Sequence, residues 1–214
     1  RIEKAGDLII PDAEISIRSE DHPWVSRGGL KLEGGLNRFD IDPKNCICID
    51  VGSSTGGFTD VLLGNSAAKV YAVDVGKGQL NWKLRQDARV VVLEGVNARY
   101  LTHEHVAGPV DLVVCDASFI GLEKVLPAAL NIAKPGAHLI ALIKPQFQAG
   151  RGDVGRGGVV RDPAVHKRVC QEVGTWLTSI GWHVLGVEES PIRGPKGNIE
   201  FLIAARQEGD LGKA

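Results

Sequence analysis

The sequence predicts an α/β fold built on a mostly parallel sheet that ends in an antiparallel hairpin. Apolar runs alternate with amphipathic segments between residues 46 and 143, as expected for repeated strand–helix–strand units. Some runs, such as Val110–Cys115, are almost wholly apolar, as in strands that are buried on both faces. Two later strands, 182–187 and 199–205, have no helix between them and should therefore pair antiparallel.

Each element has its own signal in the sequence. The predicted strands are 46–51, Lys69–Asp74, 89–93, Val110–Cys115 and 137–143, and the helices between them are Gly57–Gly64, 79–85 and 121–133. An earlier helix runs from Gly28 towards Phe39, with Ser26 as its N-cap and Leu30, Leu36 and Phe39 on its apolar face. This order of elements, closed by an antiparallel hairpin, is that of a Rossmann-like class I methyltransferase, whereas a dehydrogenase sheet stays parallel at that edge.

A long helix is predicted after a glycine-rich loop. Asp162 suits the N-cap position of this helix, and Pro163 suits its first turn, where no backbone N–H is needed. The predicted core stripe of the helix consists of Val165, Val169, Val173, Trp176, Leu177 and Ile180. The loop before it, 149–158, contains five glycines and is expected either to close as a lid or to remain a plain surface loop.

Composition narrows the class of protein. The chain has 214 residues, of which 43% are hydrophobic and 24% charged, values that are ordinary for a globular protein. It contains no apolar run long enough for a membrane span and no visible signal peptide. Its four cysteines, at positions 46, 48, 115 and 170, form no C-x-x-C pair. We therefore expect core cysteines in a reducing cytoplasm, and no metal site.

Charge is unevenly distributed along the chain. The net charge of −1 argues against nucleic-acid binding over the whole surface, but not against a local basic patch. Residues 144–168 carry six basic and two acidic side chains, an excess that would suit a phosphate-binding face.

Residues 1–23 are acidic and rich in turns, with short strands expected at 8–10 and 14–17. A pair of strands is too little to fold alone, so this segment is expected to end a domain that begins upstream.

A glycine-rich turn, Asp50-Val51-Gly52-Ser53-Ser54-Thr55-Gly56-Gly57-Phe58-Thr59, joins the first strand of the sheet to a helix. Glycines let the backbone turn sharply and approach a ligand, and the N–H groups at the helix start then face that ligand. The spacing does not fit G-x-G-x-x-G, so a dinucleotide is not indicated. In an open parallel sheet, a turn at this position is the usual ligand-binding crevice.

Two acidic residues flank this crevice. Asp50, just before the first glycine, would repel a pyrophosphate but would suit a ligand with an ammonium group, such as S-adenosylmethionine. Asp74 ends the second strand, where a carboxylate can accept hydrogen bonds from both hydroxyls of a ribose. Either acid alone could be a solvated strand end. Together with the turn, they favour a nucleoside cofactor.

Asp116 and Lys144 directly follow the fourth and fifth strands and should meet at the same edge of the sheet. Each could be a solvated strand end. However, Lys144 ends an apolar strand and precedes Pro145, so it should be partly desolvated, which favours its neutral, proton-accepting form. Asp116 would orient this lysine.

Six motifs together resemble one family. They are Ser26-Arg27-Gly28-Gly29-Leu30-Lys31-Leu32, the glycine-rich turn, Val73-Asp74-Val75-Gly76, Asp116-Ala117-Ser118-Phe119, Lys144-Pro145-Gln146-Phe147 and Gly197-Asn198-Ile199-Glu200-Phe201. In this order, they resemble the TlyA (haemolysin A) branch of the FtsJ-like RNA ribose methyltransferases. The resemblance covers residues 24–206, and residues 207–214 would be a tail.

The resemblance implies an S-adenosylmethionine-dependent enzyme that methylates the 2′-hydroxyl of a ribose in ribosomal RNA, in cytidine. It implies a catalytic tetrad at Lys31, Asp116, Lys144 and Glu200. The cofactor-binding residues are then expected to be Asp50, Gly52, Ser53, Thr55, Gly56, Gly57, Phe58, Asp74, Asn97 and Asp116. It also implies an N-terminal RNA-binding domain like that of ribosomal protein S-four, and residues 1–23 would be its end.

Three positions depart from the pattern of the family it resembles. Gly95-Val96 stand in place of Arg-Thr, Lys77 in place of an aromatic residue, and Gln148 in place of Glu. The first two put contacts on the adenine side of the cofactor in doubt, and the third concerns the lid. Three other functions remain open at this point: a membrane-active haemolysin, a small-molecule methyltransferase and a non-catalytic RNA-binding module. No basic helix with a strong apolar face supports the first.

Overall fold

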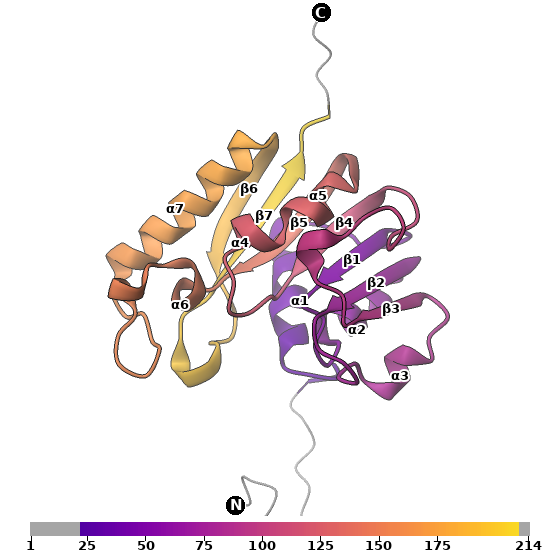
Figure 1. Ribbon diagram of the computed structural model, residues 1–214, viewed down its shortest axis with the longest axis horizontal. Coiled ribbons are helices and arrows are strands. Elements are labelled where there is room, and N and C mark those ends of the chain that lie inside the picture. Colours follow the sequence, from indigo (N-terminus) through magenta and orange to yellow (C-terminus); the bar gives the residue numbers. More distant parts are fainter. Residues whose placement is uncertain (1–21, 210–214) are drawn as a thin grey trace, which may run out of the picture.

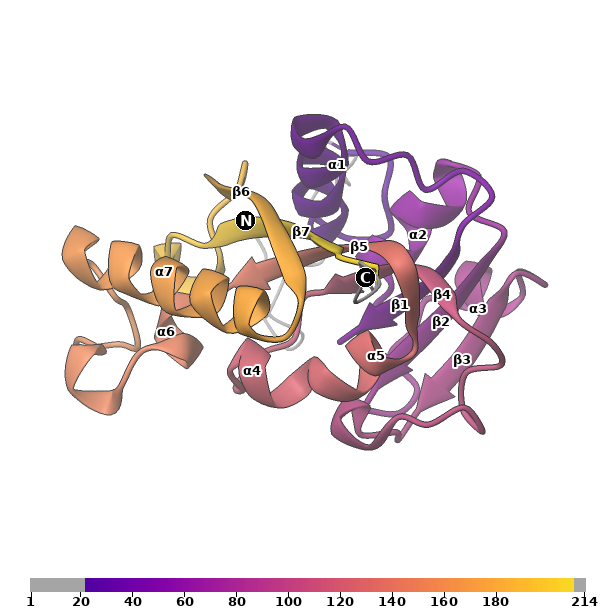
Figure 2. The same ribbon diagram turned by 90° about the horizontal axis from the view of Figure 1, so that it is seen from above.

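The computed structural model describes residues 22–209 as a three-layer α/β domain, with helices on both faces of a seven-stranded sheet (Figures 1 and 2). The strands predicted at 8–10 and 14–17 lie outside the described residues. The strands are β1 (Ile47–Val51), β2 (Lys69–Asp74), β3 (Val90–Glu94), β4 (Val110–Cys115), β5 (Ala133–Ile143), β6 (Trp182–Glu189) and β7 (Phe201–Gln207). The helices are α1 (Gly28–Phe39), α2 (Gly57–Gly64), α3 (Trp82–Arg85), η1 (Ala98–Tyr100), α4 (Leu122–Val125), α5 (Pro127–Asn131), α6 (Pro145–Gln148), η2 (Arg151–Asp153), α7 (Pro163–Ser179) and η3 (Pro195–Gly197).

The strands lie in the order β3-β2-β1-β4-β5-β7-β6. The first five pair in parallel, and β7 pairs antiparallel with both β5 and β6. The predicted mostly parallel sheet with an antiparallel C-terminal hairpin is therefore confirmed. Because β1, β4 and β5 run parallel, all three end at one edge of the sheet. The antiparallel strand β7 starts beside the end of β5, with Phe201 opposite Ile143.

Alternate residues of the strands pack on opposite faces of the sheet. In β4, Leu112 and Val114 join the cluster under α1 and α2, whereas Val113 and Cys115 join the cluster under α4, α5 and α7. Burying such a β-branched or leucine side chain contributes about 1.5–3 kcal/mol. The central strands are thereby fixed in register from both sides, which fixes the positions of their carboxyl ends.

Several predicted boundaries were wrong. The helix predicted at 121–133 is two helices, because Pro127 supplies no N–H and occupies the first turn of α5. Within 79–85, only Trp82–Arg85 is helical, since the N–H groups of Gln79 and Leu80 donate to the Glu94 carboxylate instead. Strand β5 begins at Ala133 rather than at 137, with a register shift where it pairs with β4.

The helix caps and the apolar helix faces also differ in part from those predicted. The N-cap of α1 is Arg27, and the Ser26 side chain makes no cap hydrogen bond; its backbone carbonyl accepts from Gly29 instead. The buried stripe of α1 contains Leu32 and Leu36, and Leu30 is only half-buried. Ile180, predicted in the core stripe of the long helix, is the C-cap of α7 and is 43% exposed. The predicted N-cap, Asp162, does accept from the Ala164 N–H. No helix within 22–209 is both long and apolar enough to cross a membrane.

Candidate active site

A cleft runs along the edge of the sheet where β1, β4 and β5 end. It has two halves, of about 820 and 620 Å³, which share Gly52, Ser54, Asp116, Ser118 and Phe119. One half lies towards α1 and the connection between β6 and β7. The other lies towards the ends of β2 and β3. Because the halves meet at Asp116, two ligands bound in them would meet beside this residue.

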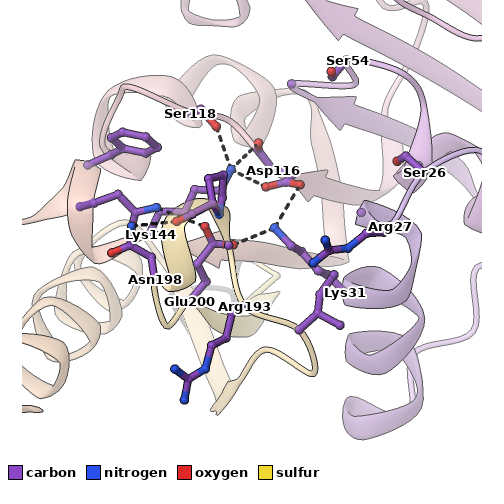
Figure 3. Close-up of a pocket in the computed structure, with 18 of the residues that line it drawn as sticks. Ser26, Arg27, Lys31, Ser54, Asp116, Ser118, Lys144, Arg193, Asn198 and Glu200 are labelled. Carbon is purple, nitrogen blue, oxygen red and sulfur yellow. Dashed lines mark hydrogen bonds and ion pairs between the residues drawn. The ribbon is translucent and has the colours of Figure 1, made fainter. Parts of the chain in front are cut away.

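The four residues of the predicted tetrad lie together at this junction (Figure 3). The Asp116 carboxylate lies between two lysines, with Oδ1 2.5 Å from Lys144 Nζ and Oδ2 3.7 Å from Lys31 Nζ. The Lys31 ammonium also donates to Glu200 Oε2 at 2.7 Å. The result is a continuous chain of ion pairs, Lys144–Asp116–Lys31–Glu200. Lys144 and Asp116 directly follow β5 and β4, Lys31 lies on α1, and Glu200 directly precedes β7.

Lys144 is held by two hydrogen bonds and one ion pair. Its Nζ donates to the Asp116 carbonyl oxygen and to Ser118 Oγ, both at 2.9 Å, in addition to its ion pair with the Asp116 carboxylate. Only 7% of the residue is exposed. A lysine fixed in this way presents Nζ at one defined position, as a positioned acid–base group requires.

Glu200 is the most deeply buried member of the tetrad, with 1% exposure. Its second oxygen accepts from Gln146 Nε2 at 3.2 Å, and its backbone carbonyl accepts from Ser190 N. A buried carboxylate is costly unless it is paired, so Lys31 and Gln146 together hold it in place.

Sequence reasoning gave no role to Ser118 or Gln146. Each stands two residues after a strand-end residue, Asp116 or Lys144, so the same strand-edge argument could have found both.

The glycine-rich turn lines the junction as predicted. Ser53, Thr55, Gly57 and Phe58 line the half of the cleft near α1, and Gly52 lines both halves. Gly52 has φ +81° and approaches the β4 turn so closely that an added Cβ would lie 2.9 Å from the Ala117 Cα.

Asp50 and Gly56 lie behind the turn rather than on the cleft wall. A Cβ at Gly56 would lie 2.2 Å from Leu84, so this glycine provides packing space. The Asp50 carboxylate is fully buried and accepts from Thr59 Oγ1 at 2.7 Å. Direct contact between Asp50 and a ligand would therefore require the turn to move.

Burial raises the pKa of Asp50 to about 7, and the nearby charges of Asp116 and Asp74 act in the same direction, against the hydrogen bond from Thr59. Because the pKa in the folded state is above its unfolded value of about 4, Asp50 stabilises the fold fully below pH 4 and loses that contribution as the pH rises to about 7.

The free energy of unfolding of the wild type should therefore fall between pH 5 and 8. In Asp50→Asn, which has no carboxyl group to titrate, this fall should be smaller by a few kcal/mol. Urea titrations across this range test the prediction. Glu104→Gln, which removes an exposed carboxylate, is the control. Parallel pH profiles for the wild type and Asp50→Asn would contradict the prediction.

The second half of the cleft contains two of the residues that the sequence predicted to bind the cofactor. Asp74 and Asn97 line it together with Val75, Val96 and Ile120. The Asp74 oxygens accept from the Ser54 and Gly76 N–H groups at 2.9 and 2.7 Å, and each keeps a lone pair for a further donor.

Glu94, at the end of β3, holds the neighbouring loop. Its carboxylate pairs with Arg85 and accepts three N–H bonds, from Gly78, Gln79 and Leu80. The hydrogen bond from Arg85 and then these backbone bonds lower the pKa of Glu94 to about 2.

The comparisons with known proteins agree with this geometry. A sequence model of FtsJ-like methyltransferases matches residues 24–207. The chain belongs to the FtsJ-like methyltransferase family. It is 50% identical, over 91% of its length and 72% of the relative's, to the 16S/23S rRNA (cytidine-2′-O)-methyltransferase TlyA of Mycobacterium tuberculosis.

Two solved structures are also similar. A candidate hemolysin from Lactococcus lactis, at 46% identity, superimposes with a TM-score of 0.84 over 87% of this chain and 89% of that one. An S-adenosylmethionine-dependent methyltransferase from Mesorhizobium loti, at 13% identity, superimposes with a TM-score of 0.59 over 81% of this chain and 96% of that one, and shows the fold alone. The class I methyltransferase fold predicted from the sequence is thus confirmed.

The three departures from the FtsJ-like pattern have structural consequences here. Gly95 has φ +73°, and a Cβ there would lie 2.6 Å from the Lys77 side chain, so the two departures are neighbours. Val96 lines the second half of the cleft, beside Asn97. Gln148 ties α6 to α4, because it donates to Glu123 and accepts from the Leu122 N–H.

The basic run at 144–168 contributes less surface charge than its composition predicts. Lys144 is buried in the tetrad, and Arg168 pairs with Asp153 at 2.6 Å and with Glu172 at 3.4 Å. Arg156, Arg161 and Lys167 remain exposed.

Proposed function

We propose that this protein transfers a methyl group from S-adenosylmethionine to the 2′-hydroxyl of a cytidine ribose in ribosomal RNA. The observation that carries the proposal is the ion-pair chain of Lys144, Asp116, Lys31 and Glu200 at the point where the two halves of the cleft meet. Family membership supports the reaction type, and the activity named for the mycobacterial relative supports the substrate. In cells, we place this activity in the cytoplasm, on ribosomal RNA or ribosomal subunits.

The residues present fit the cofactor. When bound, S-adenosylmethionine supplies an activated methyl group on a positively charged sulfur. Asp74 would accept from the ribose hydroxyls, and Asn97 would lie beside the nucleoside. The glycine turn, Gly52 to Phe58, would approach the methionine portion. Ser53 Oγ and Asp50 Oδ1 are buried and have no hydrogen-bond partner among residues 22–209. The turn therefore contains polar atoms whose hydrogen-bonding capacity is not fully used.

In the proposed mechanism, the acceptor ribose enters the half of the cleft near α1 and places its 2′-hydroxyl at Lys144. A ribose hydroxyl is a weak nucleophile, so a base must take its proton as the oxygen attacks the methyl carbon. Neutral Lys144 keeps two N–H donors for its fixed acceptors and offers its lone pair to that proton. Asp116 holds Lys144, while Lys31 and Glu200 position the ribose and shape the local field. Holding the three reacting atoms in line supplies much of the rate.

The decisive test is mass mapping of ribosomal RNA from cells with and without the gene, followed by methylation of the mapped fragment by the purified protein. A new 2′-O-methylcytidine that depends on the gene supports the proposal. A small-molecule acceptor turned over in place of RNA would support the rival methyltransferase function. Leakage of lipid vesicles caused by the pure protein would support the haemolysin function, which the name of the Lactococcus protein suggests.

Asp74→Ala should weaken S-adenosylmethionine binding by about 1–3 kcal/mol, because it removes the acceptor of the ribose hydroxyls. Asp74→Asn keeps one acceptor oxygen and should cost less. Calorimetric titration measures both effects, with Glu104→Gln as an exposed carboxylate control. Unchanged affinity in Asp74→Ala, or tighter binding of NADH than of S-adenosylmethionine, would rule out this assignment.

A further inference from the structure

Three cations outside the tetrad line the half of the cleft that would hold the acceptor: Arg27, Arg193 and Lys196. All three are exposed. Arg27 stands at the N-cap of α1, and Arg193 and Lys196 lie on the connection between β6 and β7. Figure 3 shows Arg27 and Arg193 coming from these two separate segments, with Lys31 and Glu200 near them.

The charge of the tetrad does not offset these cations. Its two lysines and two carboxylates pair with one another and have no net charge. Within residues 22–209, neither Arg27 nor Arg193 forms an ion pair, and Lys196 Nζ donates to the Gly157 carbonyl at 3.0 Å. The rim of the acceptor half is therefore positive, although the chain as a whole has a net charge of −1.

The connection that carries Arg193 is held in place. The buried Asn198 side chain accepts from Val160 N at 3.2 Å and donates to the Gly158 and Pro195 carbonyls, and its backbone carbonyl accepts from Gly194 N at 2.9 Å. A Cβ at Gly194 would lie 2.1 Å from Glu200 Oε1, so the backbone beside Arg193 passes directly over the tetrad. The backbone that carries Arg193 is thus held at a defined position next to the tetrad.

We propose that Arg27 and Arg193 bind the backbone phosphates on either side of the target nucleotide. The inference rests on the proposed function, since a ribose whose 2′-hydroxyl reaches Lys144 must leave its phosphates at the rim. A guanidinium suits this task, because its planar fork donates two hydrogen bonds to one phosphate. A neutral small-molecule acceptor would make no use of two unpaired arginines at this rim.

The test uses the RNA fragment in which methylation has been mapped. Arg27→Ala and Arg193→Ala should each raise the KM for this RNA about tenfold, as expected for the loss of a charged hydrogen bond. Each should also reduce the slope of log affinity against log salt by about one. The kcat and the affinity for S-adenosylmethionine should stay within about twofold, because neither arginine belongs to the ion-pair chain. Lys44→Ala, which removes an exposed positive charge before β1, at the opposite edge of the sheet, is the matched control.

A second measurement locates the contacts. The phosphate 5′ or 3′ to the target nucleotide is replaced by an uncharged methylphosphonate, and binding is measured with wild type and with each arginine variant. For each arginine, the replacement of one of the two phosphates should weaken binding by the wild type. The same replacement should have little further effect on the variant that lacks that arginine. Fully additive effects at both phosphates, or a KM and salt slope equal to those of Lys44→Ala, would overturn the inference while leaving methylation intact. Loss of the proposed function itself would instead appear as no 2′-O-methylation by the wild type.

Discussion

Lys144→Ala should lose most of its turnover, about 10²–10⁴-fold, while it keeps its affinity for S-adenosylmethionine. The physical reason is the geometry at the end of β5, where Nζ is fixed by Asp116 and Ser118 at the junction of the two half-clefts. Removing the amine takes away the group that accepts the 2′-hydroxyl proton, but it leaves Asp74 and the glycine turn in place. Single-turnover methylation of the mapped RNA fragment measures the loss, and calorimetry checks cofactor binding.

Lys144→Arg tells whether residue 144 acts as a general base or only as a positive charge. A guanidinium does not release its proton, so this variant should fail as well, despite its charge. Lys44→Arg, an exposed site at the other edge of the sheet, should behave as wild type. Near-normal rates in Lys144→Arg would mean that the side chain acts through charge alone, and Lys144 could no longer be the base.

Glu200→Gln should reduce both stability and turnover. The side chain is fully buried beside Lys31, whose own side chain is 9% exposed, and the substitution removes the negative charge that compensates this ammonium. Breaking a buried ion pair on one side costs about 3–5 kcal/mol, reduced here to the extent that Asp116, 3.7 Å away, compensates Lys31. Denaturant unfolding gives the stability, and single-turnover assays at a temperature where the variant is folded give the rate.

The double variant Lys31→Met with Glu200→Gln tells a structural role from a catalytic one. Removing the second charge relieves the unpaired ammonium, so stability should recover towards that of wild type. Turnover should stay low, because the pair that positions the ribose is absent. Recovery of turnover together with stability would show that Lys31 and Glu200 serve only the fold. The exposed pair Arg38–Glu188, neutralised in the same way, is the control for a surface ion pair.

The sequence was sufficient to predict the sheet and two members of the tetrad. Short, almost wholly apolar runs are typical of strands buried on both faces, and parallel strands with crossover helices bring their carboxyl ends to one edge. Asp116 and Lys144 follow two such strands directly, so their proximity could be deduced without knowing the structure. Asp74 was placed at this edge by the same argument, and it lines the second half of the cleft.

Lys31 and Glu200 could not be derived in this way. They are 169 positions apart, on the helix before the sheet and at the start of the strand that closes it. Only the packing of α1 against the sheet and the placing of β7 beside β5 bring them together, and local sequence patterns do not encode such long-range contacts. The resemblance to a family supplied these two residues, and the structure shows that they meet.

Asp50 shows most clearly what the tertiary structure decided. From the sequence, Asp50 could either face a ligand or be a solvated strand end. The sequence does not show how the glycine-rich turn folds over the end of the strand. In the structure, the turn covers the carboxylate and excludes water, which raises the pKa of Asp50 to about 7. The hydrogen bond that Thr59 on α2 donates to the carboxylate acts in the opposite direction. Its environment is set by α2 and the turn packing over β1, through contacts that exist only once the chain has folded.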